Sequence, residues 1–273
     1  GVAALVANTT GHDNTAAGFW SLYTNETGNE NTAFGVGALS SITAADGNTA
    51  VGVRALNTET SGNYNTATGT DALGMNSTGS YNTALGYKAY YLGNSTNSMA
   101  LGYNASVSSD NEVCIGNGNV TYIHGAVDWS VWSDRRFKKD IQENVPGLSF
   151  IMKLKPVTYH HDMDVIASIV PGSNRSKELE SEAASMLRTG FIAQEVEQAA
   201  REVGYDFNGV TVPKSEKEFY ALRYAEFTVP LTKAIQEQQQ MIEAQQKKLT
   251  EVEQQLMELQ QQIARLTNLL STH

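Results

Sequence analysis

A five-residue motif, Asn-Thr-Ala-x-Gly, recurs every 17 residues in the N-terminal part of the chain. A second element, Gly-x-x-Ala-Leu, follows in register, and a third, Asn-x-Thr-Gly or a close variant, precedes the next copy. The period then shortens, with related segments at 98–102 and 112–116. Self-similarity at a fixed period predicts a solenoid or stacked array rather than a globule. The five full copies begin at Asn14, Asn31, Asn48, Asn65 and Asn82.

The chemistry of one repeat indicates the kind of solenoid. Thr-Ala-x-Gly places small residues at alternating positions, as a short strand does, and Gly and Asn supply positive-φ corners. An alanine-rich helix is the alternative, but helix-breaking Gly recurs within every repeat. Because the apolar residues of a repeat are few and mostly Ala, one chain buries little surface against its conformational entropy. We therefore predict a β-solenoid or β-roll stalk over residues 1–126, with alanine-lined faces packing several chains around a shared axis.

The composition changes near residue 130. Residues 1–130 hold nine acidic and two basic residues and no proline, whereas residues 131–273 hold 20 acidic residues, 17 basic residues and all five prolines. The net charge of −10 argues against nucleic-acid binding, which needs a concentrated basic face. Cys114 is the single cysteine, so no intrachain disulfide forms. No apolar run reaches the roughly 20 residues of a membrane span. Since the chain starts at Gly1 in mid-repeat, we expect it to be a fragment.

The C-terminal segment, residues 231–273, carries a heptad pattern, which predicts a coiled coil. Mixed Ile and Leu at the a positions permit three strands, and Gln at two d positions is a device that fixes register and oligomer state. Pro230 suits the first turn of such a helix. A single amphipathic helix packed on its own domain is the alternative; the largely Gln, Glu and Lys composition of the other face disfavours it. The a residues are Ile235, Ile242, Leu249, Leu256, Ile263 and Leu270, and the d residues are Leu231, Gln238, Gln245, Val252, Leu259 and Leu266.

Residues 127–230, between repeat and heptads, have a mixed α/β pattern. Val157–Tyr159 reads as a strand, and Gly190–Ala193 reads as a strand that leads into a helix over Gln194–Ala200. Residues 160–189 look like an insertion with a turn at Pro171–Gly172 and a helix from Lys177 to Leu187. The predicted fold class is therefore mixed: a trimeric β-solenoid stalk, a small α/β domain and a C-terminal parallel trimeric coiled coil.

Two resemblances to known families follow from these motifs. Residues 1–125 resemble the head repeats of trimeric autotransporter adhesins and related phage-fibre and bacterial surface proteins, which fold as trimeric β-rolls. Residues 130–245 resemble the endosialidase-type intramolecular chaperone domain at the C-termini of phage tail spikes and fibres, a domain that also occurs in some eukaryotic transcription factors. The second resemblance is carried by four blocks, Ser133–Ile141, Leu154–Tyr159, Gly190–Val196 and Tyr224–Glu237.

The chaperone resemblance implies a homotrimer that aligns three upstream chains and is released by autoproteolysis. Cleavage in the family precedes the serine of the first block, here the Trp132–Ser133 bond. The family pairs this serine with a lysine five residues later, which makes Ser133 the implied nucleophile and Lys138 the implied general base. The insertion resembles the family's arms, which embrace the nascent fibre.

Chemistry sets its own conditions on this pair. A lysine acts as a base if burial or neighbouring cations depress its pKa, and Arg135, Arg136 and Lys139 are close in sequence. Five residues on an α-helix place two side chains about 140° apart. Ser133 must therefore lie on extended or turn backbone before a helix, or the pair must meet across subunits. In the alternative interpretation, Ser133 and Asp134 simply N-cap a helix that contains Phe137 and Ile141. We expect Asp134 to cap or orient rather than to complete a triad.

Other side chains are weaker candidates. Residues 160–164, His-His-Asp-Met-Asp, are metal-ligand types without a recognised spacing, and we expect no metal and no cofactor. His124 could assist cleavage, although a solvated surface residue is the simpler interpretation. A stripe of aromatic side chains could bind a glycan, although the same residues could cap corners or fill an outer layer. These residues are Trp20, Tyr23, Phe34, Tyr64, Tyr81 and Tyr90.

The sequence as a whole predicts a self-cleaving serine peptidase that acts as an intramolecular chaperone for an upstream fibre or enzyme domain of its own chain. The alternative is a non-cleaving structural adhesin or tail-fibre stalk that binds a host or surface receptor. The expected location is a virion tail fibre or spike, or a bacterial cell surface, with folding in the cytoplasm of the producing cell if a phage encodes the chain.

Overall fold

The computed structural model describes residues 1–120, 122–127, 129–169, 184–215 and 218–271. The chain divides into two compact units. The first comprises Gly1–Asp128 with Tyr159–Arg188, and the second comprises Trp129–Thr158 with Thr189–His273. The predicted turn at Pro171–Gly172 lies outside the described residues, as does most of the predicted helix from Lys177 to Leu187.

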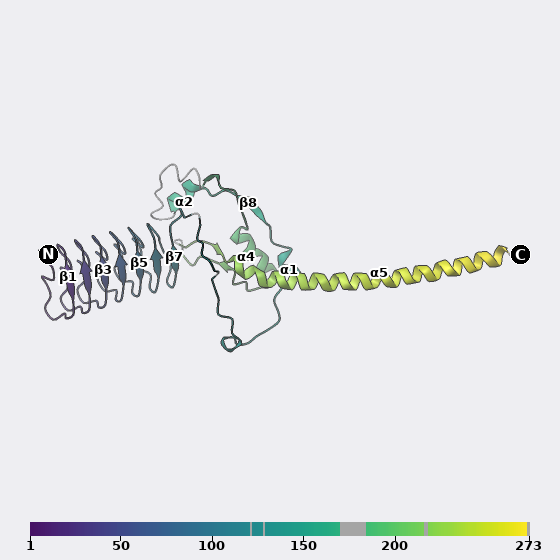
Figure 1. The fold of residues 1–273 in the computed structure, drawn as a ribbon, viewed down its shortest axis with the longest axis horizontal. Helices are drawn as coiled ribbons and strands as arrows, with labels where there is room; N and C mark the ends of the chain where they lie inside the picture. Colours follow the sequence, from purple (N-terminus) through teal and green to yellow (C-terminus); the bar gives the residue numbers. More distant parts are fainter. Residues whose placement is uncertain (121, 128, 170–183, 216–217, 272–273) are drawn as a thin grey trace. The chain divides into compact units, whose positions relative to one another are not determined.

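The repeat folds as a parallel β-solenoid, as its period predicts (Figure 1). In the described residues, successive copies form one seven-stranded parallel sheet in chain order. Each strand pairs with the equivalent residues one repeat later, so that Thr32 lies opposite Thr49 and Ala33 opposite Ala50. The pairing of Met99 with Val113 shows that the coil continues where the period shortens. The strands are β1 (Thr15–Ala17), β2 (Thr32–Phe34), β3 (Thr49–Val51), β4 (Thr66–Thr68), β5 (Thr83–Leu85), β6 (Met99–Leu101) and β7 (Val113–Ile115).

The alanines line the inside of the coil, which corrects the expectation that they face other chains. The central alanines of β2 to β6 have no exposed surface and pack with fully buried corner leucines such as Leu39 and Leu56. Because strand side chains alternate between faces, the first and third residues of each strand point outward. The outer face is therefore built from Thr, Val, Leu and Phe, while small residues fill the narrow interior.

The asparagine that opens each copy satisfies backbone groups inside the coil. Asn48 Nδ2 donates to the Gly62 carbonyl oxygen at 2.9 Å, and Asn48 Oδ1 accepts from the Asn65 backbone N–H at 2.9 Å. Asn31 makes the equivalent two bonds one turn earlier. A buried amide or carbonyl without a partner costs stability, so this polar ladder explains why each copy carries Asn rather than an apolar residue.

A column of glycines lets successive turns approach backbone to backbone. Gly52 has a φ of +139°, and a Cβ there would lie 2.5 Å from the Gly69 carbonyl oxygen. Gly35 and Gly69 show the same φ range and the same close approach to the following turn. Gly37 is different: its φ of +67° lies in a region that Ala3 also adopts, and a Cβ there would meet nothing closer than 3.5 Å.

Glu59 carries a carboxylate inside the solenoid, on a side chain with no exposed surface. Its Oε1 accepts from the Gly62 backbone N–H at 2.5 Å, and its Oε2 accepts from Asn76 Nδ2 and, at 3.4 Å, from Asn65 Nδ2. These donors favour the charged form, but burial acts in the opposite direction and outweighs them. The pKa of Glu59 is therefore raised above its ordinary value of 4.5.

The second unit packs around an aromatic cluster. Phe150 of α1 (Leu148–Ile151) contacts Phe207, which in turn contacts Phe227 of η2 (Tyr224–Phe227). The predicted helix is confirmed as α4 (Ala193–Glu202), which buries Val196 against this cluster. The short strands β10 (Val210–Thr211) and β11 (Ala221–Leu222) pair antiparallel.

The strand predicted at Val157–Tyr159 is confirmed as β8, and it pairs with β9 (Arg188–Gly190). The strand predicted at Gly190–Ala193 is misplaced, because β9 ends at Gly190 and Ile192 is already the N-cap residue of α4. Between β8 and β9 the described residues include α2 (Met163–Ile169).

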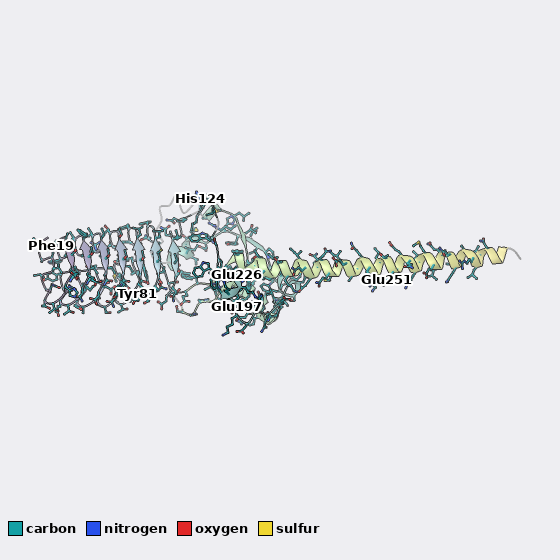
Figure 2. The ribbon with its side chains drawn as sticks, turned by 60° about the horizontal axis from the view of Figure 1, so that its bottom comes forward. Phe19, Tyr81, His124, Glu197, Glu226 and Glu251 are labelled. Carbon is teal, nitrogen blue, oxygen red and sulfur yellow. The ribbon has the colours of Figure 1, made fainter. Side chains whose placement is uncertain are left out.

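The heptad segment lies in one helix, α5 (Thr228–Ser271), 44 residues long. Its first turns pack on α1, where Glu237 Oε2 accepts from the Leu148 backbone N–H at 2.8 Å and Ala234 is buried. Further along α5 the side chains point into solvent, as that of Glu251 does in Figure 2. The apolar a and d residues from Leu231 to Leu266 are 40% to 66% exposed.

Gly52→Ala and Gly37→Ala are the same substitution at two kinds of corner. At Gly52 the added methyl group meets backbone in a conformation that alanine rarely adopts, so we expect a loss on the order of 3 kcal/mol. At Gly37 the cost is about 1 kcal/mol, that of a left-handed residue. Denaturant unfolding of the two variants measures both. Equal losses would contradict the role assigned to the glycine column.

The raised pKa of Glu59 predicts a pH dependence of solenoid stability. Between the ordinary and the raised pKa the folded state binds more protons than the unfolded state, so stability falls as pH rises through this window. Glu59→Gln should remove that contribution. The measurement is the difference in unfolding free energy between wild type and variant at several pH values from 4 upward (about the ordinary carboxyl pKa). A difference that does not vary with pH would contradict the prediction.

Candidate functional site

The candidate site begins where an extended segment turns sharply. Asp134 has extended backbone, and η1 (Arg135–Phe137) follows as one 3₁₀ turn. The Phe137 N–H donates to the Asp134 carbonyl oxygen at 3.0 Å, and the Lys138 N–H donates to that of Arg135 at 3.1 Å. Lys138 returns to extended backbone. The chain therefore turns sharply between Ser133 and Lys138, which their five-residue spacing requires if the two side chains are to meet.

This turn brings Ser133 and Lys138 together. Lys138 Nζ lies 2.7 Å from Ser133 Oγ, within hydrogen-bonding distance. The geometry matches the first of the two arrangements that the spacing allowed, with Ser133 just before a helical turn. The N-capping alternative is confirmed in part. Asp134 caps a single 3₁₀ turn that contains Phe137, whereas Ser133 does not cap it and Ile141 lies outside it.

Asp134 and Arg136 form a second contact within the turn. Asp134 Oδ1 accepts from the Arg136 backbone N–H at 2.8 Å, and the Arg136 guanidinium donates to both carboxylate oxygens, at 3.1 Å and 2.8 Å for the closest pairs. Hydrogen bonding to Arg136 lowers the pKa of Asp134. Asp134 is thus an anion that caps and braces the turn, and Arg135 is exposed.

The whole site is exposed in the single chain. Trp132 and Phe137, whose ring centroids are 6.0 Å apart, are 88% and 67% exposed, and Ser133 and Lys138 are exposed too. Ser133 and Lys138 are thus in contact, and the described residues of this chain leave both side chains open to solvent.

The metal-ligand residue types of 160–164 have local structural contacts. Asp162 Oδ1 accepts from the Val165 N–H at 3.0 Å at the start of α2, Met163 is buried, and the rings of Tyr159 and His161 are 5.5 Å apart. Within the part of the chain that is described, no group of three His, Cys, Asp or Glu side chains could hold a metal ion. His124 is exposed on the first unit (Figure 2).

The aromatic side chains of the solenoid do not form one stripe. Tyr64 and Tyr81, one turn apart, are exposed and stacked, with ring centroids 5.5 Å apart. Trp20 stacks on Phe19. Tyr90 is fully buried, which corrects its place in a surface stripe: it occupies the interior column that Leu22, Leu39, Leu56 and Leu73 fill in earlier turns.

Sequence reasoning missed two polar groups that the structure shows to be built in, Glu59 and Glu237. Glu59 stands where Asn25 and Asn76 stand in other repeats, so its burial could have been inferred from the period. Glu237 looks like any other surface acid of α5. In the described residues no helix is both long and apolar enough to cross a bilayer.

Residues 133–205 match the model of a family described as chaperone of endosialidase, whose name also classes it as a peptidase. The match starts at Ser133 and includes Lys138 and three of the four blocks seen in the sequence. This part of the chain is therefore an endosialidase-chaperone-type domain, and the family suggests an intramolecular chaperone role. No curated protein and no solved structure matches the chain.

Proposed function

We propose that residues 127–273 form a trimerising intramolecular chaperone that sets the register of an upstream fibre and then cuts itself off between Trp132 and Ser133. The observation that carries the proposal is the 2.7 Å contact between Lys138 Nζ and Ser133 Oγ, at the first residue of the family match. A serine and an amine at this distance, in a family named both chaperone and peptidase, are suited to a serine–lysine reaction.

The chemistry is an acyl shift followed by hydrolysis. Neutral Lys138 takes the hydroxyl proton of Ser133, and Oγ bonds to the Trp132 carbonyl carbon. The carbon–nitrogen bond between the two residues then breaks, and the proton passes from Lys138 to the leaving nitrogen. The product is an ester of the Trp132 carboxyl group on Ser133, with a free α-amine. Water hydrolyses the ester and releases residues 1–132 from residues 133–273.

Self-association is the second part of the proposal, and the heptad face of α5 supports it. Nine apolar a and d side chains among the described residues lie exposed along one stripe. A helix of this length that buries no apolar face along most of its course has little tertiary support, whereas a coiled coil buries that stripe between copies. We assign a parallel trimer, since mixed Ile and Leu at the a positions permit three strands and the resemblance implies a homotrimer.

The outer face of the solenoid supports the same association. Apolar side chains at the third strand position and two residues further on are exposed along the turns, and contiguous apolar patches mark interaction surfaces. Because a shared assembly has one symmetry, solenoids and coiled coil would take the same number of chains. The exposed residues are Phe19, Phe34, Val36, Val51, Val53, Leu85, Tyr87, Leu101, Tyr103 and Ile115.

Assembly would also activate the proposed self-cleavage. Ser133, Lys138, Trp132 and Phe137 are exposed in one chain, so neighbouring copies are the available source of burial. Burial lowers a lysine pKa and converts the amine to a base. The cut would then follow register-setting rather than precede it, which suits a chain on a virion tail fibre, a spike or a bacterial surface.

The second candidate function is a stalk that stays attached to its C-terminal domain and binds a receptor or glycan. Two observations favour it: the exposure of Lys138, and the exposed stack of Tyr64 on Tyr81, an apolar surface with polar hydroxyl edges. The two functions differ in whether the purified chain is cut.

Intact mass spectrometry of purified protein tests the cleavage. Wild type should give residues 1–132 and 133–273, and Ser133→Ala a single chain. Lys138→Met should slow cleavage by about 100-fold or more, the contribution of a general base. Hydroxylamine should capture the ester and leave a hydroxamate on Trp132.

Lys214→Met and Ser149→Ala are the matched controls, since each makes the same change at an exposed residue outside the turn; both variants should still be cut. Two fragments from Ser133→Ala would rule out the serine as nucleophile. A single uncut chain from wild type would favour the attached stalk.

The oligomeric state tests the coiled coil. In the uncut Ser133→Ala chain, light scattering after gel filtration should give three times the chain mass of 29.6 kDa. Leu259→Asp, at a d position, should dissociate or weaken the trimer because it places a charge in an apolar seam. Gln254→Asp, on the solvent face of the same turns, should leave it intact. A monomer, or any number of chains other than three, would contradict the assignment.

A further inference from the structure

We propose that Asp134 is a positioning residue, which holds Lys138 against Ser133 by capping the turn between them. The cut itself rests on the proposed function, whereas the positioning is a property of the folded segment and can be measured separately. The inference starts from a steric problem: five residues of regular helix would carry the two side chains to different faces.

The solution lies in four consecutive residues. The carboxylate of Asp134 accepts from the Arg136 backbone N–H at 2.8 Å, and its carbonyl oxygen accepts from the Phe137 N–H at 3.0 Å. These bonds close the 3₁₀ turn, which uses three residues per turn instead of 3.6. Lys138 then leaves on extended backbone, and its Nζ reaches Ser133 Oγ at 2.7 Å.

The turn has little else to hold it. None of the residues of η1 is buried, and the ring contact between Trp132 and Phe137 is exposed, so apolar packing gives the turn little support. The pair between Asp134 and Arg136 is bidentate but exposed to solvent, and salt weakens an exposed ion pair. The side-chain cap is thus the main constraint. Asp and Asn are comparable capping residues, whereas Ala has no acceptor.

This comparison supplies a matched pair of variants. Asp134→Asn and Asp134→Ala both remove the negative charge, but only the Asn variant keeps an oxygen that can accept from the Arg136 N–H. A difference between them therefore reports the cap rather than the charge.

The first measurement does not depend on cleavage. Ser133→Cys places a thiol where the hydroxyl is, in a Cys114→Ala background that removes the other thiol. Ala matches that site, because Cys114 stands opposite Ala100 in the strand register. The rate of iodoacetamide alkylation against pH, followed by mass on the intact chain at low salt, gives the pKa of the thiol.

An ammonium group held beside a thiol lowers its pKa below the free value of about 8.5. We expect a lowered thiol pKa both with the native Asp134 and in the Asp134→Asn variant. In Asp134→Ala we expect a thiol pKa that is higher by about one pH unit. Lys138→Met, which removes the cation, should match Asp134→Ala. Equal thiol pKa values in the Ala and Asn variants would overturn the inference.

The second measurement is the cleavage rate with Ser133 in place. We expect Asp134→Asn to be cut at a rate close to that of wild type and Asp134→Ala to be cut at least about tenfold more slowly, since small displacements of reacting groups are costly. Trimer formation should be the same in all three. Equal rates for Asp134→Ala and Asp134→Asn would overturn the inference. An uncut wild type would overturn the proposed function instead, and the thiol measurement would still decide whether Asp134 positions Lys138.

Discussion

The solenoid depends on hydrogen bonds that each turn makes to the equivalent residues one repeat away. Gly52 approaches Gly69 closely enough to exclude any side chain. Asn48 links both neighbouring turns, because its backbone N–H donates to Asn31 Oδ1 and its own Oδ1 accepts from the Asn65 N–H. Stacking of this kind is quasi-one-dimensional, because a turn contacts only its neighbours. It gives the stalk a regular outer face, but the same regularity leaves the choice of partner turn undefined. Chains that associate through such faces could pair in several registers of similar energy, so a separate element must choose one. In the proposed assembly, α5 is that element.

The period predicted much of this fold, and its limits are informative. Short strands over Thr-Ala-x, stacked in a solenoid, followed directly from the 17-residue spacing, and the structure shows that they pair in parallel. The spacing did not predict that the alanines point inward. Alternation along a strand tells which residues share a face, but it does not tell which face lies inside the coil. The narrow interior selects the small side chain of Ala33 over those of its neighbours. Tyr90 occupies the position that leucines hold in the preceding turns, and this position, rather than the aromatic residue type, accounts for its burial. β9 ends at Gly190, earlier than expected, because α4 already begins at Ala193 with Ile192 as its N-cap residue.

The sequence predicted which residues make up the candidate site, but not how they are arranged in space. The resemblance to the chaperone family points to Ser133 and Lys138, whose spacing is unfavourable in a helix and unconstrained in a loop. A single 3₁₀ turn resolves this, and periodicity carries no signal for a turn of three residues. The one local signal is Asp134, a capping residue type directly before the turn. Sequence could name the serine, the lysine and the cap, while the contact of Lys138 Nζ with Ser133 Oγ had to come from the structure.

In the proposed mechanism, groups that are exposed in the single chain link assembly, activation and release. In one chain the apolar stripe of α5, the outer face of the solenoid and the Ser133–Lys138 pair all face solvent. Association would remove the first two from water, which is favourable, and would cover the third, which makes a neutral amine accessible. The proposed cut would then remove the helix through which the chains first associate. The stalk would be left without a low-barrier route to dissociation, and its persistence would be governed by an unfolding rate rather than by an equilibrium. A register-setting domain that is activated by its own assembly therefore acts once, after the register is chosen.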